Sequence, residues 1–235
     1  MSAPRYGAEI RRALLAKHFL LREADAKTLD QLVASSIVVS YGNRQRIFDK
    51  GDDGDRLLGV LGGQVRIFVM SSEGRELIMN VIMPNELFGE ISLIDGKPRS
   101  ASAVAIGPTD LLHIRRQDFL SLLQKNGDLC LKFMGILCER VRWTSGLLED
   151  ASLLDLPSRL AKRLLSLAAG IGEKQGDGIR IGVKLSQTDL GNMLGVTREA
   201  VNKQLREWKK DGLVDMHDGQ VLIVNPKSLS ALVGR

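Results

Sequence analysis

The sequence predicts an α+β protein built from a β-domain of short strands, one long helix and a winged helix-turn-helix. Three observations predict this fold class. Short β-branched runs separated by turn residues recur between residues 36 and 116. Residues 118–154 contain almost no helix-breaking residues. Residues 186–224 follow the order helix, glycine turn, helix, strand, turn, strand.

The composition excludes several classes of protein. The chain has 235 residues, 44% hydrophobic and 26% charged, which is ordinary for one large or two small globular domains. No apolar run approaches the ~18 residues of a membrane span. Charged side chains interrupt the first fifteen residues, so they contain no signal-peptide segment. Two cysteines cannot form a disulfide framework, and we therefore expect a cytoplasmic protein without membrane contacts.

The positive charge is confined to the last third of the chain. Residues 1–156 contain 20 Lys and Arg against 20 Asp and Glu, whereas residues 157–235 contain 13 against 8. A neutral part joined to a basic part favours a sensing or assembly unit attached to a unit that binds an anion such as nucleic acid.

The N-terminal part begins with a helical pattern and continues as strands. Residues 8–35 are predicted helical, because Leu15, Leu29, Leu32 and Val33 recur near the helical period. Turns are expected at Gly62-Gly63 and Gly107-Pro108, among others. The expected strands are residues 37–39, 57–61, 65–70, 77–83, 101–106 and 111–114. So many short strands predict a β-sandwich or barrel.

A heptad pattern runs along the long predicted helix, residues 118–154. Its a and d positions are Cys130, Met134, Leu137, Val141, Thr144, Leu148 and Ala151. A seam sustained over three heptads predicts a parallel dimer, and packing on the chain's own β-domain is the alternative. Thr144 is the one polar member, and a hydroxyl in a seam is often satisfied by a ligand or partner.

The third part begins at Asp155, which is placed to cap a new helix that has Pro157 in its first turn. We therefore expect three domains, covering residues 1–117, 118–154 and 155–235. Residues 170–178 are predicted to be a loop, followed by a strand at 179–183.

Residues 186–224 carry the signals of a DNA-binding module. Ser186 and Asp189 can form a capping box, Gly195 ends the first helix, and Thr197 caps the second. Two strands with a turn between them follow as a wing. The candidate DNA-binding residues are Ser186, Gln187, Thr197, Arg198, Glu199, Asn202, Lys203 and Arg206. Their side chains can contact bases and phosphates. A surface helix with solvated charges explains the polar face alone, but not the caps, wing and basic charge together.

A second signal lies between Phe88 and Ala101. A Gly89-Glu90 pair opens a short helical turn, and Arg99 follows a Gly-Lys-Pro turn. An arginine can pair with a phosphate, and a glutamate can accept from a ribose hydroxyl. This stretch resembles the phosphate-binding cassette of cyclic-nucleotide-binding domains. Together with the helix-turn-helix, it makes the chain resemble bacterial transcription regulators of the cyclic-AMP receptor protein/FNR family.

The resemblance implies a cyclic-nucleotide-binding β-roll (jelly-roll-like), a long dimerisation helix and a C-terminal winged helix-turn-helix. It also implies that the ligand contacts Gly89, Glu90, Arg99, Ser100, Arg140, Thr144 and Ser145. The first four would hold the ribose and cyclic phosphate. Thr144 would contact the base from its own subunit, and Ser145 from the partner. Lys203 stands where the receptor protein has an arginine. The positive charge is kept, but a lysine cannot donate the two parallel hydrogen bonds of a guanidinium.

The implied partners are double-stranded DNA, a cyclic nucleotide, a second copy of the chain and RNA polymerase. Cyclic AMP is the leading ligand. Cyclic GMP and a ligand-independent regulator remain alternatives, as does a regulatory module whose output is protein association or catalysis. We expect no metal, haem or iron–sulfur cluster, because Cys130, Cys138, His18, His113 and His217 lack ligand spacing. No catalytic cluster is recognisable in the sequence, so we expect no enzyme.

Overall fold

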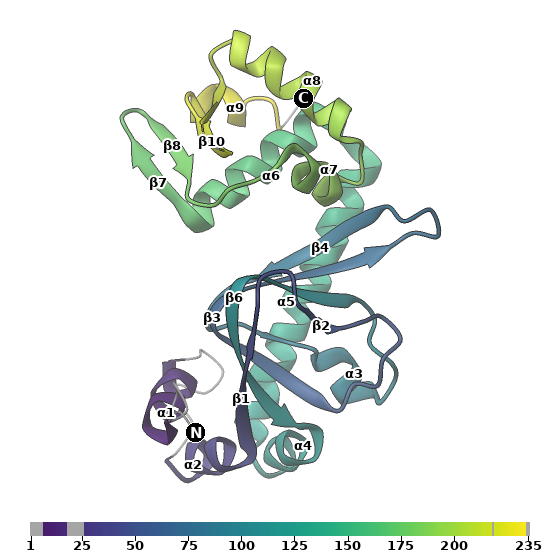
Figure 1. Ribbon diagram of the computed structural model, residues 1–235, viewed down its shortest axis with the longest axis vertical. Helices are drawn as coiled ribbons and strands as arrows, with labels where there is room; N and C mark the ends of the chain where they lie inside the picture. The colour runs from purple at the N-terminus through teal and green to yellow at the C-terminus, as the bar shows by residue number, and fades with distance from the viewer. Residues whose placement is uncertain (1–6, 18–25, 218, 234–235) are drawn as a thin grey trace. The chain divides into compact units, whose positions relative to one another are not determined.

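The computed structural model describes residues 7–17, 26–217 and 219–233. The chain divides into two compact units (Figure 1). Residues Met1–Val69 and Met79–Arg140 form the first unit, and residues Met70–Ile78 and Val141–Arg235 form the second. The predicted α+β class is confirmed: a β-sheet domain comes first, a long helix follows, and a helix-turn-helix domain ends the chain.

The β-sheet domain contains helices in addition to its strands. Its elements in chain order are α1 (Ala8–Lys17), α2 (Ala26–Ser35), β1 (Ser36–Tyr41), β2 (Arg46–Phe48), β3 (Arg56–Met70), β4 (Glu76–Ile82), β5 (Leu87–Phe88), α3 (Glu90–Asp95), β6 (Ser102–Arg115) and α4 (Arg116–Lys125). The helical stretch expected at residues 8–35 is thus present as α1 and α2, and residues 18–25 lie outside the described part of the chain.

The sheet is organised around two long strands, β3 and β6. The strand order is β1-β6-β3-β4, with β2 paired to β6 and β5 to β3. The turns expected at Gly62-Gly63 and Gly107-Pro108 are wrong, because these residues lie inside β3 and β6. The register between the two strands shifts around Gly62, which is a bulge that bends the pair without ending it. A Cβ at Gly63, where φ is 79°, would lie 2.4 Å from the Pro108 carbonyl oxygen.

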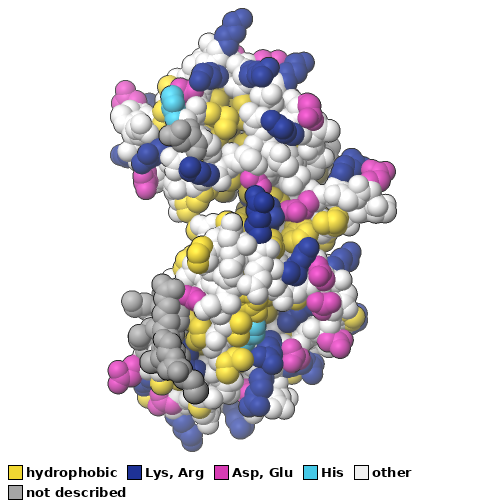
Figure 2. Space-filling view, in the orientation of Figure 1, with side chains coloured by type: hydrophobic (Ala, Val, Ile, Leu, Met, Phe, Trp, Pro, Cys, Tyr) yellow, Lys and Arg dark blue, Asp and Glu magenta, His cyan; other side chains and the backbone are white. Residues whose placement is uncertain are grey.

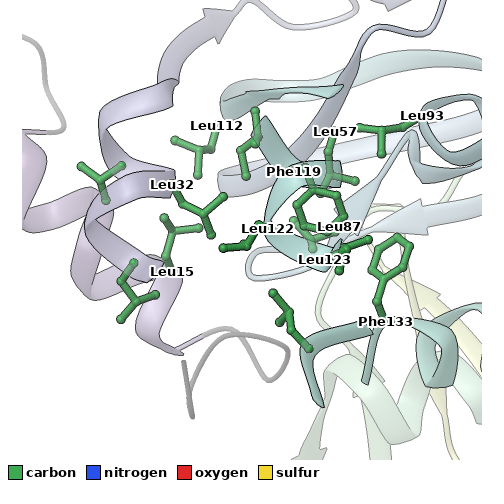
Figure 3. Packing of buried hydrophobic residues seen from close by; sticks show 14 of the residues in the cluster. Leu15, Leu32, Leu57, Leu87, Leu93, Leu112, Phe119, Leu122, Leu123 and Phe133 are labelled. Atoms are coloured by element: carbon green, nitrogen blue, oxygen red, sulfur yellow. The ribbon is translucent and has the colours of Figure 1, made fainter. Parts of the chain in front are cut away.

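Apolar side chains cover both faces of this sheet. Successive residues of a strand point to opposite faces, so the neighbours Leu57 and Leu58 belong to different buried clusters. Leu57 packs with residues of the surrounding helices, among them Phe119 and Phe133 (Figure 3). Leu58 packs in the other cluster, whose members, among them Phe88, all lie on strands. The cassette begins at Phe88 on β5, and apolar packing on both faces of the sheet holds this strand in place.

The predicted single helix over residues 118–154 is interrupted at Asn126. Helix α4 ends at Lys125, and α5 runs over Gly127–Leu153. Asn126 is extended, with φ −135° and ψ 95°. Its side-chain oxygen accepts from the Leu129 backbone N–H at 3.0 Å. Asparagine is a good helix cap, and here it caps the start of a second helix.

The heptad seam expected on α5 is wrong at two of its positions, Cys130 and Leu137. Cys130 and Leu137 are half-buried and pack against the core of the β-sheet domain. The exposed face instead contains a row that we call the exposed stripe: Leu131, Met134, Cys138, Val141, Ser145 and Leu148. Leu131, Val141 and Leu148 are 64%, 66% and 69% exposed. Cys138, expected to be a packing residue, is exposed.

The second unit holds the C-terminal domain. Its elements after α5 are α6 (Leu156–Ile171), β7 (Gly172–Gln175), β8 (Gly178–Ile181), α7 (Gln187–Leu194), α8 (Arg198–Lys210), β9 (Val214–His217), β10 (Gln220–Ile223) and α9 (Pro226–Ser230). The strands form one sheet in the order β7-β8-β10-β9. The loop expected at residues 170–178 is therefore largely strand β7 and its turn. The wing predicted after α8 is confirmed as the β9–β10 hairpin.

Two side-chain contacts connect α5 to α6, and we call this region, residues 143–163, the elbow. Asp155 caps α6 as predicted, accepting from the Ser158 N–H at 2.9 Å. Lys162 pairs with Asp150 at 2.6 Å. The Arg163 guanidinium lies over the Trp143 ring, 5.5 Å from its centroid. Burial lowers the pKa of Arg163.

Candidate functional site

Arg99 is the centre of the predicted cassette, and it is 6% exposed. Its Nη1 donates to the Gly89 carbonyl at 2.7 Å and to the Ser92 hydroxyl at 2.9 Å. Its Nη2 donates to the Arg56 carbonyl at 2.9 Å. The guanidinium also lies over the Phe48 ring, 4.4 Å from the centroid. Backbone and side-chain acceptors thus fix the position of the buried cation of the cassette.

Burial lowers the pKa of Arg99, and the negative charges of Asp55, Glu90 and Asp52 oppose this shift. Hydrogen bonds to neutral acceptors satisfy Nη1 and one hydrogen of Nη2 without neutralising the charge. A buried cation without a directly paired anion is costly. The site is therefore suited to an anionic ligand.

Glu90 is the second buried charge of the cassette, and it is 2% exposed. Arg140, from α5, donates through Nη1 to Glu90 Oε1 at 2.5 Å. Arg140 Nη2 donates to the Leu87 carbonyl. The sequence associated Arg140 with the segment that meets the base, whereas in the structure it contacts the cassette itself.

Gly89 must be a glycine in this arrangement. Its φ is 78°, a left-handed conformation that side chains disfavour. A Cβ at this position would also lie 2.5 Å from Arg99 Nη1. The glycine therefore allows the backbone to approach the guanidinium that it binds.

Two buried polar atoms of the cassette have no hydrogen-bond partner among the described residues. They are Glu90 Oε2, an acceptor, and Arg99 Nε, a donor. Buried polar groups are normally paired, and leaving one unpaired costs about 1–3 kcal/mol. A ligand that donates a hydroxyl to the carboxylate and brings an anionic oxygen to the guanidinium would satisfy both.

Sequence reasoning missed three residues of this site, namely Phe48, Gly54 and Ser92. Phe48 covers one face of the Arg99 guanidinium. A Cβ at Gly54 would lie 2.1 Å from the Ser92 hydroxyl, so this glycine provides the room for Ser92. The one available signal is the pair of glycines at positions 51 and 54, which by itself predicts no more than a turn.

The remaining predicted ligand residues are exposed. Ser100 follows Arg99 at the end of the cassette. Thr144 and Ser145 lie on the part of α5 that belongs to the second unit. The structure therefore brings together Gly89, Glu90, Arg99 and Arg140. Thr144 and Ser145, which are expected to contact the base, belong to the other unit.

The helix-turn-helix has the local structure that its sequence predicts. The capping box is present, with the Asp189 N–H donating to Ser186 Oγ at 3.0 Å and the Ser186 N–H to Asp189 at 3.1 Å. Gly195 ends α7 with φ 66°. Thr197 caps α8, accepting from the Ala200 N–H at 3.3 Å. Gly191 is buried where the helices meet, and a Cβ there would lie 2.8 Å from the Val196 carbonyl.

One face of α8 is buried and the other is charged and exposed. Val201, Leu205 and Trp208 are at most 3% exposed and anchor the helix. Arg198, Glu199, Lys203 and Arg206 are exposed, and Asn202 is half-exposed. Lys and Arg side chains gather over the region of α8 in the space-filling view (Figure 2). Among the predicted residues that precede α8, Ser186 and Thr197 are exposed caps and Gln187 is half-exposed.

Histidine, cysteine and carboxylate side chains form no group of three or more that could hold a metal ion within the described ranges. His113 is buried beside Tyr41, whose hydroxyl lies 3.2 Å from His113 Nε2. His217 is exposed and contacts Asp215, and His18 lies outside the described residues. None of the helices described here is both long and apolar enough to cross a membrane.

Two family models match the chain, one for each predicted functional module. The family described as "Cyclic nucleotide-binding domain" matches residues 38–126. The family described as "Crp-like helix-turn-helix domain" matches residues 158–232. The first contains the Arg99 cassette, and the second contains α7, α8 and the wing.

Curated relatives are similar over most of their length. A CRP-like cAMP-activated global transcriptional regulator of Mycobacterium tuberculosis is 28% identical over 217 residues, covering 92% of this chain and 97% of the relative. A cyclic AMP receptor protein of Thermus thermophilus is 33% identical over 181 residues, covering 77% and 81%.

Solved structures share the fold. The c-di-GMP-responsive global regulator CLP of Xanthomonas campestris superposes with a TM-score of 0.75 at 24% identity, covering 86% of this chain and all of that chain. At this identity the likeness concerns the fold alone. The combination of β-domain, long helix and winged helix is thus shared with regulators whose names include different ligands.

Proposed function

The chain belongs to the CRP/FNR family of transcription regulators, and from this premise we propose that it is a homodimer that binds cyclic AMP and couples this binding to sequence-specific DNA binding. The observation that carries the proposal is the pair of unsatisfied buried atoms, Glu90 Oε2 and Arg99 Nε. A cyclic nucleotide carries both groups they need, because its ribose 2′-hydroxyl donates and its cyclic phosphate is an anion.

Each cassette residue has a role in this proposal. Arg99 binds the phosphate, Glu90 accepts from the ribose, and Gly89 keeps the backbone close to both. Arg140 pairs with Glu90 Oε1, so that Glu90 Oε2 is left to accept a hydrogen bond from the ligand. Ser100, at the exposed end of the cassette, adds a hydroxyl at the phosphate.

The choice of cyclic AMP rests on two supports. The names of the relatives in Mycobacterium tuberculosis and Thermus thermophilus refer to cyclic AMP. The family resemblance assigns Thr144 and Ser145 to the base, one from each subunit. Small hydroxyl side chains can serve either purine, so cyclic GMP is the second candidate. A regulator that binds DNA without a small ligand is the third.

The proposed dimer uses the exposed stripe of α5. Three large apolar side chains on one helix face, each more than 60% exposed, favour a partner surface. Met134, Val141 and Leu148 recur every seven residues, as a helix pair requires. A second copy of the chain presents the same stripe, so the two copies pair through identical surfaces in a two-fold symmetric dimer.

DNA binding is assigned to α8 and its caps. The exposed Arg198, Glu199 and Lys203 follow the capped start of the helix, where a recognition helix contacts base edges. In a dimer two such helices meet successive major grooves. The ligand can favour this arrangement only if it binds the DNA-competent state more tightly. We place the protein in the cytoplasm with the DNA, and we expect RNA polymerase as its protein partner.

The test is a calorimetric titration of the full-length protein with cyclic AMP and, in a matched run, with cyclic GMP. We expect micromolar or tighter binding of cyclic AMP and weaker binding of cyclic GMP. Arg99→Ala should abolish binding and leave a folded protein, whereas Arg142→Ala, which alters an exposed arginine outside the cassette, should bind normally. Tighter binding of cyclic GMP would reverse the ligand assignment, and normal binding by Arg99→Ala would overturn the cassette.

A selection from random duplexes, with and without ligand, tests the output. A salt-sensitive, sequence-selective complex that cyclic AMP strengthens is expected. An equally tight complex without ligand would favour the ligand-independent regulator. Failure to select any sequence would leave a regulatory module with another output.

A further inference from the structure

Ser92 is a buried hydroxyl that contacts the key cation of the cassette. It lies on α3 and is 2% exposed. Its Oγ accepts from Arg99 Nη1 at 2.9 Å, and the same nitrogen donates to the Gly89 carbonyl at 2.7 Å. Both hydrogens of Nη1 are therefore engaged by the protein.

The remaining donors of Arg99 share one edge of the guanidinium. Nη2 uses one hydrogen on the Arg56 carbonyl at 2.9 Å. Nε has no hydrogen-bond partner among the described residues. Nε and Nη2 lie side by side on the planar fork, and such an edge can donate two parallel hydrogen bonds to two oxygens of one phosphate.

Gly54 provides the space that Ser92 occupies. A Cβ at residue 54 would lie 2.1 Å from Ser92 Oγ and 2.3 Å from Ser92 Cβ. The same atom would lie 3.4 Å from Arg99 Cζ. Since the φ of Gly54 is not in the left-handed region, the need for glycine here arises from space and not from backbone conformation.

We infer that Ser92 is a positioning residue that holds Arg99 so that its Nε–Nη2 edge is directed to the cyclic phosphate, and that Gly54 makes this possible. The inference rests on the proposed binding of a cyclic nucleotide and names what orients its phosphate. Without the hydroxyl, Nη1 keeps a single acceptor and the guanidinium can turn about it.

The first experiment is a calorimetric titration of the full-length Ser92→Ala protein with cyclic AMP. The Kd should rise about tenfold, as expected for losing a hydrogen bond to a charged group. Ser36→Ala is the matched control, since Ser36 is 3% exposed and its hydroxyl donates to the Val33 carbonyl in the same unit. The control Kd should stay within about twofold. An unchanged Kd in Ser92→Ala overturns the inference.

The second experiment separates orientation from general support of the fold. The two phosphorothioate diastereomers of cyclic AMP carry sulfur on one or the other exocyclic phosphate position. A fixed donor edge distinguishes these positions, so the unaltered protein should bind the diastereomers unequally. Ser92→Ala should bring the two Kd values closer together. Weaker binding with an unchanged ratio would mean that Ser92 only supports the fold, which overturns the inference.

Gly54→Ala provides an independent variant. It should weaken cyclic AMP binding at least as much as Ser92→Ala, and the double variant should lose less than the two single losses combined. Full additivity contradicts a shared role. If the unaltered protein binds neither cyclic AMP nor cyclic GMP, the proposed function fails and this inference with it. Normal binding together with an insensitive Ser92→Ala removes only the inference.

Discussion

Arg140 and Glu90 form an ion pair whose two partners differ in burial. Arg140 Nη1 lies 2.5 Å from Glu90 Oε1, and their side chains are 32% and 2% exposed. The pair connects α5 to the first turn of α3. It balances the buried carboxylate and leaves the other oxygen available, so one residue of the long helix prepares the cassette for its ligand.

Removing the cation of this pair should destabilise the protein. Arg140→Ala leaves a buried carboxylate without its partner, and we expect the free energy of unfolding to fall by about 1–3 kcal/mol, less than for a fully buried pair because Arg140 is partly solvated. Adding Glu90→Gln should recover part of the loss. Urea unfolding at neutral pH measures both. Arg142→Ala, which removes an exposed neighbouring arginine, is the control. If the losses of unfolding free energy caused by Arg140→Ala and Glu90→Gln simply add in the double variant, the pairing is contradicted.

A charge placed in the exposed stripe should separate the proposed dimer. Val141→Glu puts two carboxylates into the contact, and burying unpaired like charges should raise the dimer dissociation constant at least about 100-fold. Sedimentation velocity at micromolar concentration would then report a monomer. Ile106→Glu makes the same change at a 39% exposed residue on β6 and should leave the dimer intact. A Val141→Glu protein that remains dimeric would place the interface elsewhere.

Base preference should depend on Glu199. Its carboxylate is exposed next to the N-cap of α8 and can accept from a cytosine amino group. Glu199→Ala should relax the preference at one base pair by about 1–3 kcal/mol of discrimination. Lys210→Ala, at the far end of α8, should weaken binding to all sequences without changing the profile. A binding-site selection whose base frequencies are identical before and after Glu199→Ala excludes it as a reader.

Stability should fall on mild acidification because of His113. Burial lowers its pKa to about 4, with Arg56 adding to the shift and Asp55 opposing it. Between pH 6.5 and 4 the unfolded chain binds a proton that the folded chain does not, so stability decreases as the pH falls through this window. The contribution is about 3 kcal/mol.

The measurement is the free energy of unfolding from urea titrations at several values between pH 7 and 4. His113→Gln keeps a group that can bond the Tyr41 hydroxyl but does not titrate, so its curve should be flatter by this amount. Parallel curves for the two proteins would show that His113 takes up its proton equally in the folded and unfolded states.

Local signals allowed much of the fold to be predicted. The caps Asp155, Ser186 and Thr197 act within a few residues, so their helix starts could be identified from sequence and are present. Glycines were ambiguous, because the same residue permits a turn or a bulge. Gly63 lies in a bulge of a continuing strand, and only its pairing with β6 distinguishes the two.

The features that could not be predicted from the sequence depend on packing between residues that are far apart in the chain. Cys130 and Leu137 fit the heptad spacing, but the β-sheet domain covers them, so the exposed stripe passes through Leu131 and Cys138 instead. Ser92 had no sequence signal, because its role depends on Gly54, 38 positions earlier in the chain. The charged cassette residues could be named individually, whereas part of what holds them comes from distant segments, such as the Arg56 carbonyl and the Arg140 guanidinium.

The elbow gives the protein an internal optical reporter. The chain has two tryptophans. Trp208 is 3% exposed in the winged-helix core, whereas Trp143 is 40% exposed beneath the Arg163 guanidinium. Indole emission responds to neighbouring charge and to water, so the two residues emit from different surroundings. In a Trp208→Phe protein the remaining emission would come from the elbow alone, and a change on adding nucleotide or DNA would follow the bend between α5 and α6 in real time.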